Sequence, residues 1–407
     1  MRILKIANIP DDRNTGMGRV MHATADHLRA MGHGVDFLFA GDVGRARLGR
    51  GDRFGFPVAL VGAVRRAMRD RGTYDVVEIH EPAAAWYCLQ RRRDPAALPP
   101  CVVMSHGLEE TQWQLRLQLD RLIGQRTSWK SRLLVPATLL PQARYGLLHC
   151  QQVMCLNSYD EAYLRDRLHL PAERISRVTN GVDTMFFAPP DALERYGDAV
   201  RLLFVGSWLE KKGRRFLVQT FERLWERYGT ATSVPAATRR NLRLSLLGTG
   251  MSENEVLRSF TPAVRGAITV RPRVNDRELS EAYASHHIFA FPTYFEPWGL
   301  VLLEAAAAGM ALATTGAGGP ADLFTDGCDA LLVPPADSEG FTNAVGRLIE
   351  DGKERARLGE NARNRAWQFS WHAAAEGHLR AYERARAIAA AEMAGARERK
   401  TRPREVN

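Results

Sequence analysis

Short apolar runs that alternate with helix-length segments constrain the fold of this chain more than any other sequence feature. An apolar run at 2–9, a turn-forming stretch at 14–18, a helical pattern at 20–31 and an apolar run at 34–39 predict strand, loop, helix and strand. Repeated units of this kind form a parallel sheet with crossover helices. The further strands predicted in the first half of the chain are 75–80, 101–105 and 152–156.

A second alternation follows a linker expected at 186–198, which contains Pro189 and Pro190. Because 407 residues exceed what one compact core usually holds, we expect two domains, 1–190 and 191–370. The predicted fold is α/β, with two facing, doubly wound, Rossmann-like domains that bind a substrate in the interdomain cleft. The strands predicted in the second half are 201–205, 242–247, 267–270, 287–291, 310–314 and 330–333, and the helices are 214–228, 253–260 and 300–308.

The net charge of +10 is concentrated in two segments. Residues 111–150 carry six basic residues against Asp120, and the tail from Arg384 onward carries seven against three glutamates. Such segments suit an anionic membrane surface or an anionic acceptor, and a solvated basic face is an equally good interpretation. No nucleic-acid-binding motif accompanies them, so a nucleic-acid partner is not expected. The last residues, 388–407, are expected to be disordered.

The sequence contains no segment that we expect to carry the chain across a membrane. Residues 1–9 include Arg2 and Lys5 and are followed by a proline, unlike the apolar core of a secretory signal. The most apolar long stretch, 299–319, is interrupted by Glu304. Five scattered cysteines without a C-x-x-C pair indicate neither a disulfide framework nor a zinc site. We therefore expect a cytoplasmic protein, with peripheral attachment at the inner face of the membrane as an open alternative.

The sharpest site signal is the stretch 295–305, Phe-Glu-Pro-Trp-Gly-Leu-Val-Leu-Leu-Glu-Ala, at a predicted strand-to-helix junction. Proline suits a first helical turn, so the N–H groups of Gly299, Leu300 and Val301 should be free to bind an anion such as a diphosphate. Glu304 lies in an otherwise apolar helix, where a carboxylate needs a hydrogen-bonding partner. Ribose hydroxyls would satisfy it, and a salt bridge or an exposed position is the alternative.

This stretch resembles the E-x7-E motif of the retaining, two-domain glycosyltransferases of family 4, with Glu296 and Glu304 as the two acids. The resemblance extends over most of the chain. It implies the GT-B fold, a nucleotide-diphosphate sugar bound mainly by the C-terminal domain, and an acceptor bound mainly by the N-terminal domain. It also implies that a final helix at 371–387 packs back on the N-terminal domain. The other matching motifs are Gly16 with Gly18, His106, 180–183, 205–206, 212–213, 248–250 and 318–319.

The resemblance implies a role for each matching residue of the C-terminal half. Glu296 resembles the glutamate that hydrogen-bonds the donor sugar, and Glu304 resembles the one that holds the ribose. Lys212 resembles the lysine that neutralises the departing diphosphate, a role that suits a fixed cation beside a developing anion. Many relatives have an arginine where this chain has Ser207, and Lys211 is the residue that would compensate. A Gly-Ser start followed by a basic pair resembles the subgroup that includes bacterial lipopolysaccharide-core glucosyltransferases, which implies a role in cell-envelope polysaccharide synthesis.

Three positions of the N-terminal half resemble family site residues. His106, after a predicted strand, resembles the histidine that contacts the transferred sugar. Gly16 and Gly18 resemble the loop that approaches the donor phosphate and the acceptor, and an ordinary turn is the alternative explanation. His80 follows another predicted strand, where a site role and a structural role have equal weight.

The implied reaction transfers a sugar, with retention of anomeric configuration, from a nucleotide-diphosphate sugar to a glycan, a lipid-linked glycan or a small molecule. The sequence contains no D-x-D triplet, so we expect neither a metal nor another cofactor, with cationic side chains and a helix start in the metal's place. Three alternatives stay open. A nicotinamide dehydrogenase is disfavoured because the third glycine of its fingerprint is missing at Met21. The others are a nucleotide-sugar epimerase on the same fold and a non-catalytic basic protein that binds membranes or nucleic acid.

Overall fold

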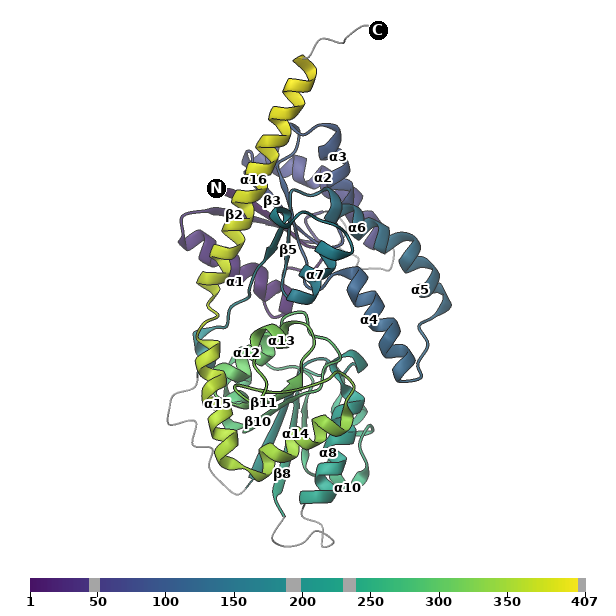
Figure 1. Ribbon diagram of the computed structural model, residues 1–407, viewed down its shortest axis with the longest axis vertical. Coiled ribbons are helices and arrows are strands. Elements are labelled where there is room, and N and C mark those ends of the chain that lie inside the picture. The colour runs from purple at the N-terminus through teal and green to yellow at the C-terminus, as the bar shows by residue number, and fades with distance from the viewer. Residues whose placement is uncertain (44–51, 188–198, 230–238, 402–407) are drawn as a thin grey trace. The chain divides into compact units, whose positions relative to one another are not determined.

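The chain forms two compact units, each built on its own six-stranded parallel sheet (Figure 1). One unit comprises Met1–Thr179 together with Trp371–Asn407, and the other comprises Asn180–Ser370. The division at Asn180 falls earlier in the chain than the predicted boundary at 190. The computed structural model describes residues 1–43, 52–187, 199–229 and 239–401.

The sheet of the first unit has the strand order β2-β1-β3-β4-β5-β6, and all neighbouring strands are parallel. Three of its inner strands, β3, β4 and β5, are wholly buried, and β4 has the sequence Cys-Val-Val-Met. Parallel strands covered on both faces appear in the sequence as continuous apolar runs, which is why sequence analysis found five of the six. The strands are β1 (Arg2–Ile6), β2 (Gly34–Leu38), β3 (Val76–His80), β4 (Cys101–Met104), β5 (Gln152–Cys155) and β6 (Ile175–Arg177).

The first helix, α1, begins earlier than the predicted helix at 20–31. Its first turn includes Gly16 and Gly18, and the Thr15 side chain caps it by accepting a hydrogen bond from Gly18 N at 3.1 Å. The two glycines predicted a turn. With Thr15 as the cap, the helix instead begins at Gly16 and includes both glycines. The helices of the first unit are α1 (Gly16–Ala30), α2 (Asp52–Arg71), α3 (Ala85–Arg93), α4 (Glu109–Leu122), α5 (Trp129–Leu134), α6 (Leu140–His149), α7 (Ser158–Asp166) and α16 (Trp371–Thr401), with the short π-helical segment η1 (Val135–Leu139) between α5 and α6.

Helix α16 belongs to the first unit although it follows the second unit in sequence. It packs against α1 and against β3, β4 and β5, and Figure 1 shows it in yellow beside this unit. The helix extends to Thr401, so residues 388–401 of the tail that we expected to be disordered are helical. Alanine has the highest helix propensity, and buried alanines such as Ala385 and Ala389 continue the packed face. Residues 402–407 lie outside the described residues.

The sheet of the second unit has the order β12-β11-β10-β7-β8-β9 and is also parallel throughout. All six of its predicted strands are present, while most of the linker expected at 186–198 lies outside the described residues. The strands are β7 (Ala199–Val205), β8 (Asn241–Leu247), β9 (Ile268–Arg271), β10 (Ile288–Phe291), β11 (Ala311–Thr315) and β12 (Leu331–Val333). The helices are α8 (Arg214–Tyr228), α9 (Glu253–Leu257), α10 (Pro262–Arg265), α11 (Asp276–Ser285), α12 (Leu300–Ala307), α13 (Gly319–Leu323), α14 (Ser338–Glu350) and α15 (Gly352–Ala366), and the 3-10 turn η5 (Glu210–Lys212) precedes α8.

Candidate functional site

The glycine-containing loop of the first unit follows β1, at the carboxyl ends of the strands. A Cβ atom added to Gly18 would lie 2.0 Å from the carbonyl oxygen of Asp12, so only glycine fits there. A Cβ atom added to Gly16 would meet no atom within 4 Å among the described residues. Packing of the loop therefore explains Gly18, whereas Gly16 lies where a ligand has room to approach.

His80 is the last residue of β3, His106 follows the neighbouring strand β4, and their rings contact each other. The distance from His106 Nε2 to His80 Nδ1 is 3.0 Å, and the stacked ring centroids are 4.9 Å apart. His80 Nε2 lies 2.9 Å from Oε1 of Glu78. The structure therefore joins the two histidines, which the sequence presented as separate candidates, into one hydrogen-bonded chain.

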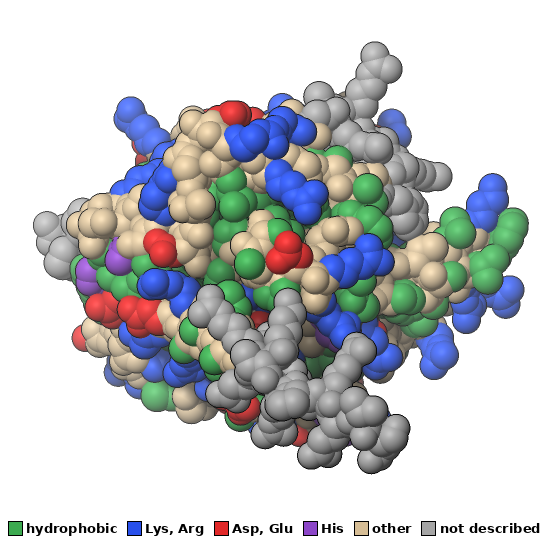
Figure 2. All heavy atoms as spheres, turned by 90° about the horizontal axis from the view of Figure 1, so that it is seen from above, with side chains coloured by type: hydrophobic (Ala, Val, Ile, Leu, Met, Phe, Trp, Pro, Cys, Tyr) green, Lys and Arg blue, Asp and Glu red, His purple; other side chains and the backbone are tan. Residues whose placement is uncertain are grey.

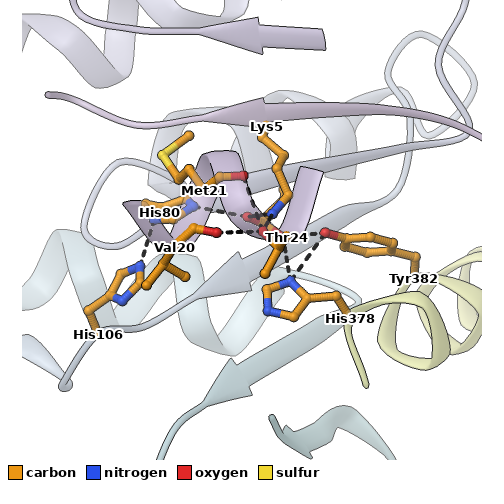
Figure 3. Close-up of polar contacts among 9 residues, drawn as sticks. Lys5, Val20, Met21, Thr24, His80, His106, His378 and Tyr382 are labelled. Atoms are coloured by element: carbon orange, nitrogen blue, oxygen red, sulfur yellow. Dashed lines mark hydrogen bonds and ion pairs between the residues drawn. The ribbon is translucent and has the colours of Figure 1, made fainter. Parts of the chain in front are cut away.

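The carboxylate of Glu78 is buried and lies at the inner end of this chain. Figure 3 shows the side chains of Lys5, His80, His378 and Tyr382 converging on one place. Its Oε1 is 3.3 Å from Nζ of Lys5, and its Oε2 accepts a hydrogen bond of 2.5 Å from the Tyr382 hydroxyl. His378 Nδ1 lies 3.2 Å from the same Oε2. Since Tyr382 and His378 belong to α16, the C-terminal helix binds the same carboxylate as His80.

Burial and hydrogen bonding set the charges of these groups. Burial alone would raise the pKa of Glu78, but the Lys5 cation and the neighbouring histidines hold it well below its usual range, so the carboxylate stays ionised. Burial, together with nearby His80, holds the pKa of His106 well below its usual range, so this ring is neutral. A carboxylate only accepts hydrogen bonds, so His80 donates from Nε2. His80 Nδ1 and His106 Nε2 share the next hydrogen bond, whose direction is set by the tautomers of the two rings.

In the second unit, backbone contacts hold together the loops that follow β7 and β10. The amide of Tyr294 donates to the carbonyl of Lys211 at 2.9 Å, and the hydroxyl of Thr293 donates to the same oxygen at 3.2 Å. Gly213 has φ +83°, and an added Cβ atom would lie 1.9 Å from the carbonyl oxygen of Pro292. Glycine is therefore required where the turn after η5 meets the segment after β10.

Lys212 and Glu296 form an ion pair across these two loops, between Nζ and Oε2. The ammonium also lies 5.4 Å from the ring centroid of Phe291, which favours a cation. The two charged side chains are 24% and 13% exposed, so a polar ligand can reach both. The structure thus brings together the residues predicted to bind the diphosphate and the donor sugar.

The same glutamate lies against the start of α12. Gly299 has φ +103°, and an added Cβ atom would lie 3.5 Å from Cγ of Glu296 and 3.0 Å from Cδ1 of Leu302. Leu300 and Val301, the first two residues of the helix, are partly exposed. The first N–H groups of a helix have no acceptor within it, so they favour an anion. A cationic side chain, a carboxylate and a helix start therefore lie together at one end of the sheet.

Glu304 is buried, with 4% of its surface exposed, which excludes the exposed position considered from the sequence. The hydroxyl of Tyr283 in α11 donates to its Oε2 at 2.9 Å. Sequence analysis missed Tyr283, since a tyrosine on an amphipathic helix gives no signal of the partner it binds.

The remaining predicted residues of this unit, Ser207 and Lys211, have exposed side chains. The carbonyl of Ser207 accepts a hydrogen bond of 2.8 Å from Leu209 N, which shapes the loop between β7 and η5. Both side chains lie on the loop that carries Lys212. They are therefore placed to help bind an anion.

No group of three or more histidine, cysteine or acidic side chains in the described parts of the chain is arranged to hold a metal ion. Cys88, Cys101, Cys150 and Cys155 are buried free thiols, and Cys328 is exposed. The expectation that the reaction needs no metal stays a prediction.

Two family models match consecutive parts of this chain. The model described as Glycosyltransferase Family 4 matches residues 14–186, and the model described as Glycosyl transferases group 1 matches residues 189–365. The chain belongs to glycosyltransferase family 4. This family member carries the Lys212–Glu296 pair within the second match and the His80–His106 pair within the first.

Solved structures of the same architecture resemble this family 4 chain over nearly its whole length. Sucrose-phosphate synthase from Thermosynechococcus elongatus has a TM-score of 0.75 at 21% identity, covering 94% of this chain and 98% of that chain. HepE from Anabaena, solved in complex with UDP and glucose, has a TM-score of 0.63 at 16% identity, covering 93% of this chain and 98% of that chain. Together with the family matches, these likenesses confirm the predicted GT-B fold.

A curated relative of this family 4 chain is D-inositol 3-phosphate glycosyltransferase from Xylanimonas cellulosilytica. It is 32% identical over 231 residues, which cover 52% of this chain and 52% of the relative. The chain spans about half the length of the curated relatives it matches. The relative's substrate therefore does not transfer to this chain by similarity alone.

Sequence analysis missed the buried partners of the two histidines. Lys5 lies within an apolar strand, where a buried charge needs a partner, and that requirement is a usable signal. His378 and Tyr382 are four residues apart in an Ala-rich helix, a spacing that places them on one face. No sequence spacing indicates that this face meets Glu78.

Proposed function

We propose that this family 4 chain is a retaining glycosyltransferase that transfers a sugar from a nucleoside-diphosphate sugar to a hydroxyl acceptor without a metal. The observation that carries the proposal is the Lys212–Glu296 ion pair beside the start of α12. A diphosphate leaving group needs fixed positive charge, which a lysine and free helix N–H groups supply. A donor sugar needs hydroxyl acceptors, which the Glu296 carboxylate supplies.

In the proposed reaction, the bond between the anomeric carbon and the diphosphate oxygen breaks while the acceptor hydroxyl oxygen bonds to the same carbon from the same face. The proton of that hydroxyl moves to the departing phosphate oxygen. Lys212 and the N–H groups of Leu300 and Val301 stabilise the negative charge that grows on the diphosphate. His106 offers Nδ1 to a hydroxyl of the transferred sugar.

We place the nucleoside of the proposed donor beside Glu304. Its carboxylate accepts a hydrogen bond from Tyr283, and a carboxylate can accept several hydrogen bonds, including those of ribose hydroxyls. The complex of HepE with UDP and glucose supports a nucleotide donor for this fold. The base and the sugar are left to experiment, because one pocket contact discriminates by only about 1–3 kcal/mol.

Thermal stabilisation by a panel of nucleoside diphosphates and their sugar conjugates tests this proposal. We expect one nucleotide to raise the melting temperature equally with and without a metal chelator, and the effect to be lost in Glu304→Ala. Stabilisation that requires a divalent cation would contradict the metal-free mechanism. Release of an isomerised sugar nucleotide without acceptor would favour the epimerase alternative.

We further propose that the enzyme acts at the inner face of a membrane, held there by the arm formed by residues 121–134. Trp129, Leu133 and Leu134 are 71%, 61% and 54% exposed, unusually high values for large apolar side chains. Exposed Arg121, Arg126, Lys130 and Arg132 accompany them. Figure 2 shows hydrophobic and basic side chains side by side on the projection at the right, where α5 lies in Figure 1. Together they complement an anionic lipid surface. Among the described residues, no helix is both long and apolar enough to span a bilayer.

Co-sedimentation with vesicles that contain anionic lipid tests the arm. We expect Trp129→Ala combined with Leu133→Ser to reduce the bound fraction several-fold, because the arm then loses two large apolar side chains that would insert into the lipid. Val58→Ser is the matched control, since Val58 is 55% exposed in the same unit but outside the arm. Equal binding by the parent and the arm variant would exclude this surface.

A further inference from the structure

Helix α16 brings two polar side chains into the core of the first unit. His378 and Tyr382 lie four positions apart, on one face of the helix, and both are fully buried. The Tyr382 hydroxyl donates to Oε2 of Glu78 at 2.5 Å, and His378 Nδ1 lies 3.2 Å from the same oxygen. Since a carboxylate only accepts hydrogen bonds, His378 donates from Nδ1. The C-terminal helix therefore holds one oxygen of Glu78 with two hydrogen bonds.

The other oxygen of Glu78 is held from the sheet. Its Oε1 lies 3.3 Å from Nζ of Lys5 in β1 and 2.9 Å from Nε2 of His80 in β3. Lys5 in turn donates to the hydroxyl of Thr24 in α1 at 2.6 Å. Both oxygens of the carboxylate thus have partners, and a buried network whose hydrogen bonds are satisfied is rigid. Rotation of the Glu78 carboxylate would break bonds on both sides.

His80 passes this fixed geometry to a residue that a ligand can reach. His80 is 3% exposed, and its other ring nitrogen, Nδ1, lies 3.0 Å from Nε2 of His106. The two rings also stack, with an interplanar angle of 25°. His106 is partly exposed, whereas the side chains deeper in the network are buried. In Figure 3, His106 lies on one side of the network and Tyr382 on the opposite side, so the network connects α16 to a partly exposed ring.

Stability alone is a weak explanation for this network. Replacing a buried ion pair such as Lys5–Glu78 by apolar residues of similar volume is often neutral or stabilising. Burial and the Lys5 cation lower the pKa of His378, so this ring is neutral and supplies a hydrogen bond without adding a charge. What the arrangement does provide is a defined orientation of His80 and, through it, of His106.

We propose that Tyr382 and His378 are positioning residues for the sugar of the donor. Through Glu78 and His80 they fix the ring of His106 in the orientation that contacts that sugar, and neither touches the sugar itself. This inference rests on the proposed glycosyl transfer. It makes a helix at the end of the chain part of the machinery that recognises the donor.

Calorimetric binding to the full-length protein tests the proposal. The probes are UDP-glucose, UDP-N-acetylglucosamine, GDP-mannose and ADP-glucose, each with its nucleoside diphosphate, and the pair that the parent binds most tightly is used. Tyr382→Phe should raise the Kd of the nucleotide sugar at least about threefold, within the range expected for one net hydrogen bond. The Kd of the nucleoside diphosphate should stay within about 1.5-fold, because His106 is assigned to the sugar alone. A structural role alone would leave both constants unchanged, and that result would overturn the proposal.

A double-mutant cycle identifies the residue through which Tyr382 acts. His106→Ala should itself raise the Kd of the nucleotide sugar at least about threefold, because the sugar contact is lost. Adding Tyr382→Phe to it should change this Kd by less than about 1.5-fold, since there is no ring left to position. Losses that multiply in the double variant would show that Tyr382 acts independently of His106, and would also overturn the proposal.

His378 offers a second, independent variant. His378→Ala should raise the Kd of the nucleotide sugar as Tyr382→Phe does, whereas His378→Asn should restore it, because its amide N–H can donate from a position close to that of Nδ1. Equal losses in both variants would contradict the proposal. Tyr163→Phe is the matched control, since the Tyr163 hydroxyl donates to Oε2 of Glu110 at 2.7 Å in the same unit. It should leave both constants at the parental values.

Binding by the parent separates the two levels of inference. Every variant is assayed at a temperature where thermal unfolding shows it to be folded. If the parent binds a nucleotide sugar and Tyr382→Phe binds both compounds as the parent does, only the positioning role is overturned. If the parent binds none of the probes, the proposed glycosyl transfer is contradicted, and this inference falls with it.

Discussion

His106 Nε2 lies 3.0 Å from His80 Nδ1, and the other ring nitrogen of His80 donates to the ionised carboxylate of Glu78. A buried carboxylate thus orients, through one intervening ring, a candidate site histidine.

Replacement of Glu78 by glutamine should destabilise the protein. The change leaves Lys5 buried without its counter-ion, and breaking a buried pair in this way lowers the free energy of unfolding by about 3–5 kcal/mol. Urea denaturation measures the change. Glu383→Gln, at an exposed position of α16, is the control and should change the value by less than about 0.5 kcal/mol. A loss below about 1 kcal/mol in Glu78→Gln would contradict the role of the pair.

Tyr382→Phe should have a smaller effect because it removes only the hydroxyl that donates to Glu78. A hydrogen bond to a charged group contributes about 1.5–3 kcal/mol. The same denaturation experiment should therefore place this variant between the parent and Glu78→Gln. A variant as stable as the parent would show that α16 does not hold the carboxylate through this bond.

Activity should depend strongly on the Lys212–Glu296 pair. We expect Lys212→Ala and Glu296→Ala each to reduce transfer at least about 100-fold, the effect of losing one well-placed transition-state contact. Lys353→Ala, at an exposed position of the same unit outside the site, is the control and should leave the rate near the parental value. Near-parental rates in the first two variants would remove both residues from the mechanism.

Gly213→Ala should destabilise the second unit far more than Gly250→Ala. Both glycines have positive φ, +83° and +68°, so each alanine carries a conformational penalty of about 1–2 kcal/mol. Only Gly213 adds a clash, because its Cβ atom would lie 1.9 Å from the Pro292 carbonyl oxygen. Thermal unfolding of the two variants measures the difference. Equal melting temperatures would argue against the close approach of these loops.

Stability should fall with rising pH through the ionisation of Glu81. Its pKa is raised to about 8 in the folded protein, chiefly by burial and then by Glu109, with a further contribution from Asp160. A raised pKa means that the folded state holds the proton more tightly than the unfolded state. The associated stability is fully present below the unfolded pKa, near 4.5, and is lost as the pH rises through about 8. Urea denaturation between pH 5 and 9 should show Glu81→Gln gaining on the parent as pH increases, and parallel curves would contradict the burial of this group.

The apolar runs predicted both sheets because a parallel strand that is covered on both faces appears in the sequence as a continuous apolar run. Strand β6, Ile175–Arg177, was missed because only one of its three residues, Ile175, is apolar, which is too few to form a pattern. The helical end of α16 was wrongly expected to be disordered. The prediction gave more weight to its arginines than to the alanines, which pack on the first unit. In both cases, the secondary structure depended on the length of the segment or on its tertiary packing, which composition does not report.

The residues of the candidate site also differ in whether a local sequence pattern could predict them. Glu296, Glu304 and Lys212 were found because they resemble family motifs, and backbone contacts between two loops bring Lys212 and Glu296 together. Glu78 and Tyr382 are 304 positions apart, and no local pattern reports a contact of that kind.

The return of α16 to the first unit has a consequence for how the protein is made. The second unit is one continuous stretch, Asn180–Ser370, so all its strands have left the ribosome before α16 has been synthesised. The first unit, although it begins the chain, must wait for the last helix. Until then Glu78 lacks the tyrosine and the histidine that bind its Oε2, and the unit at the start of the chain is completed last.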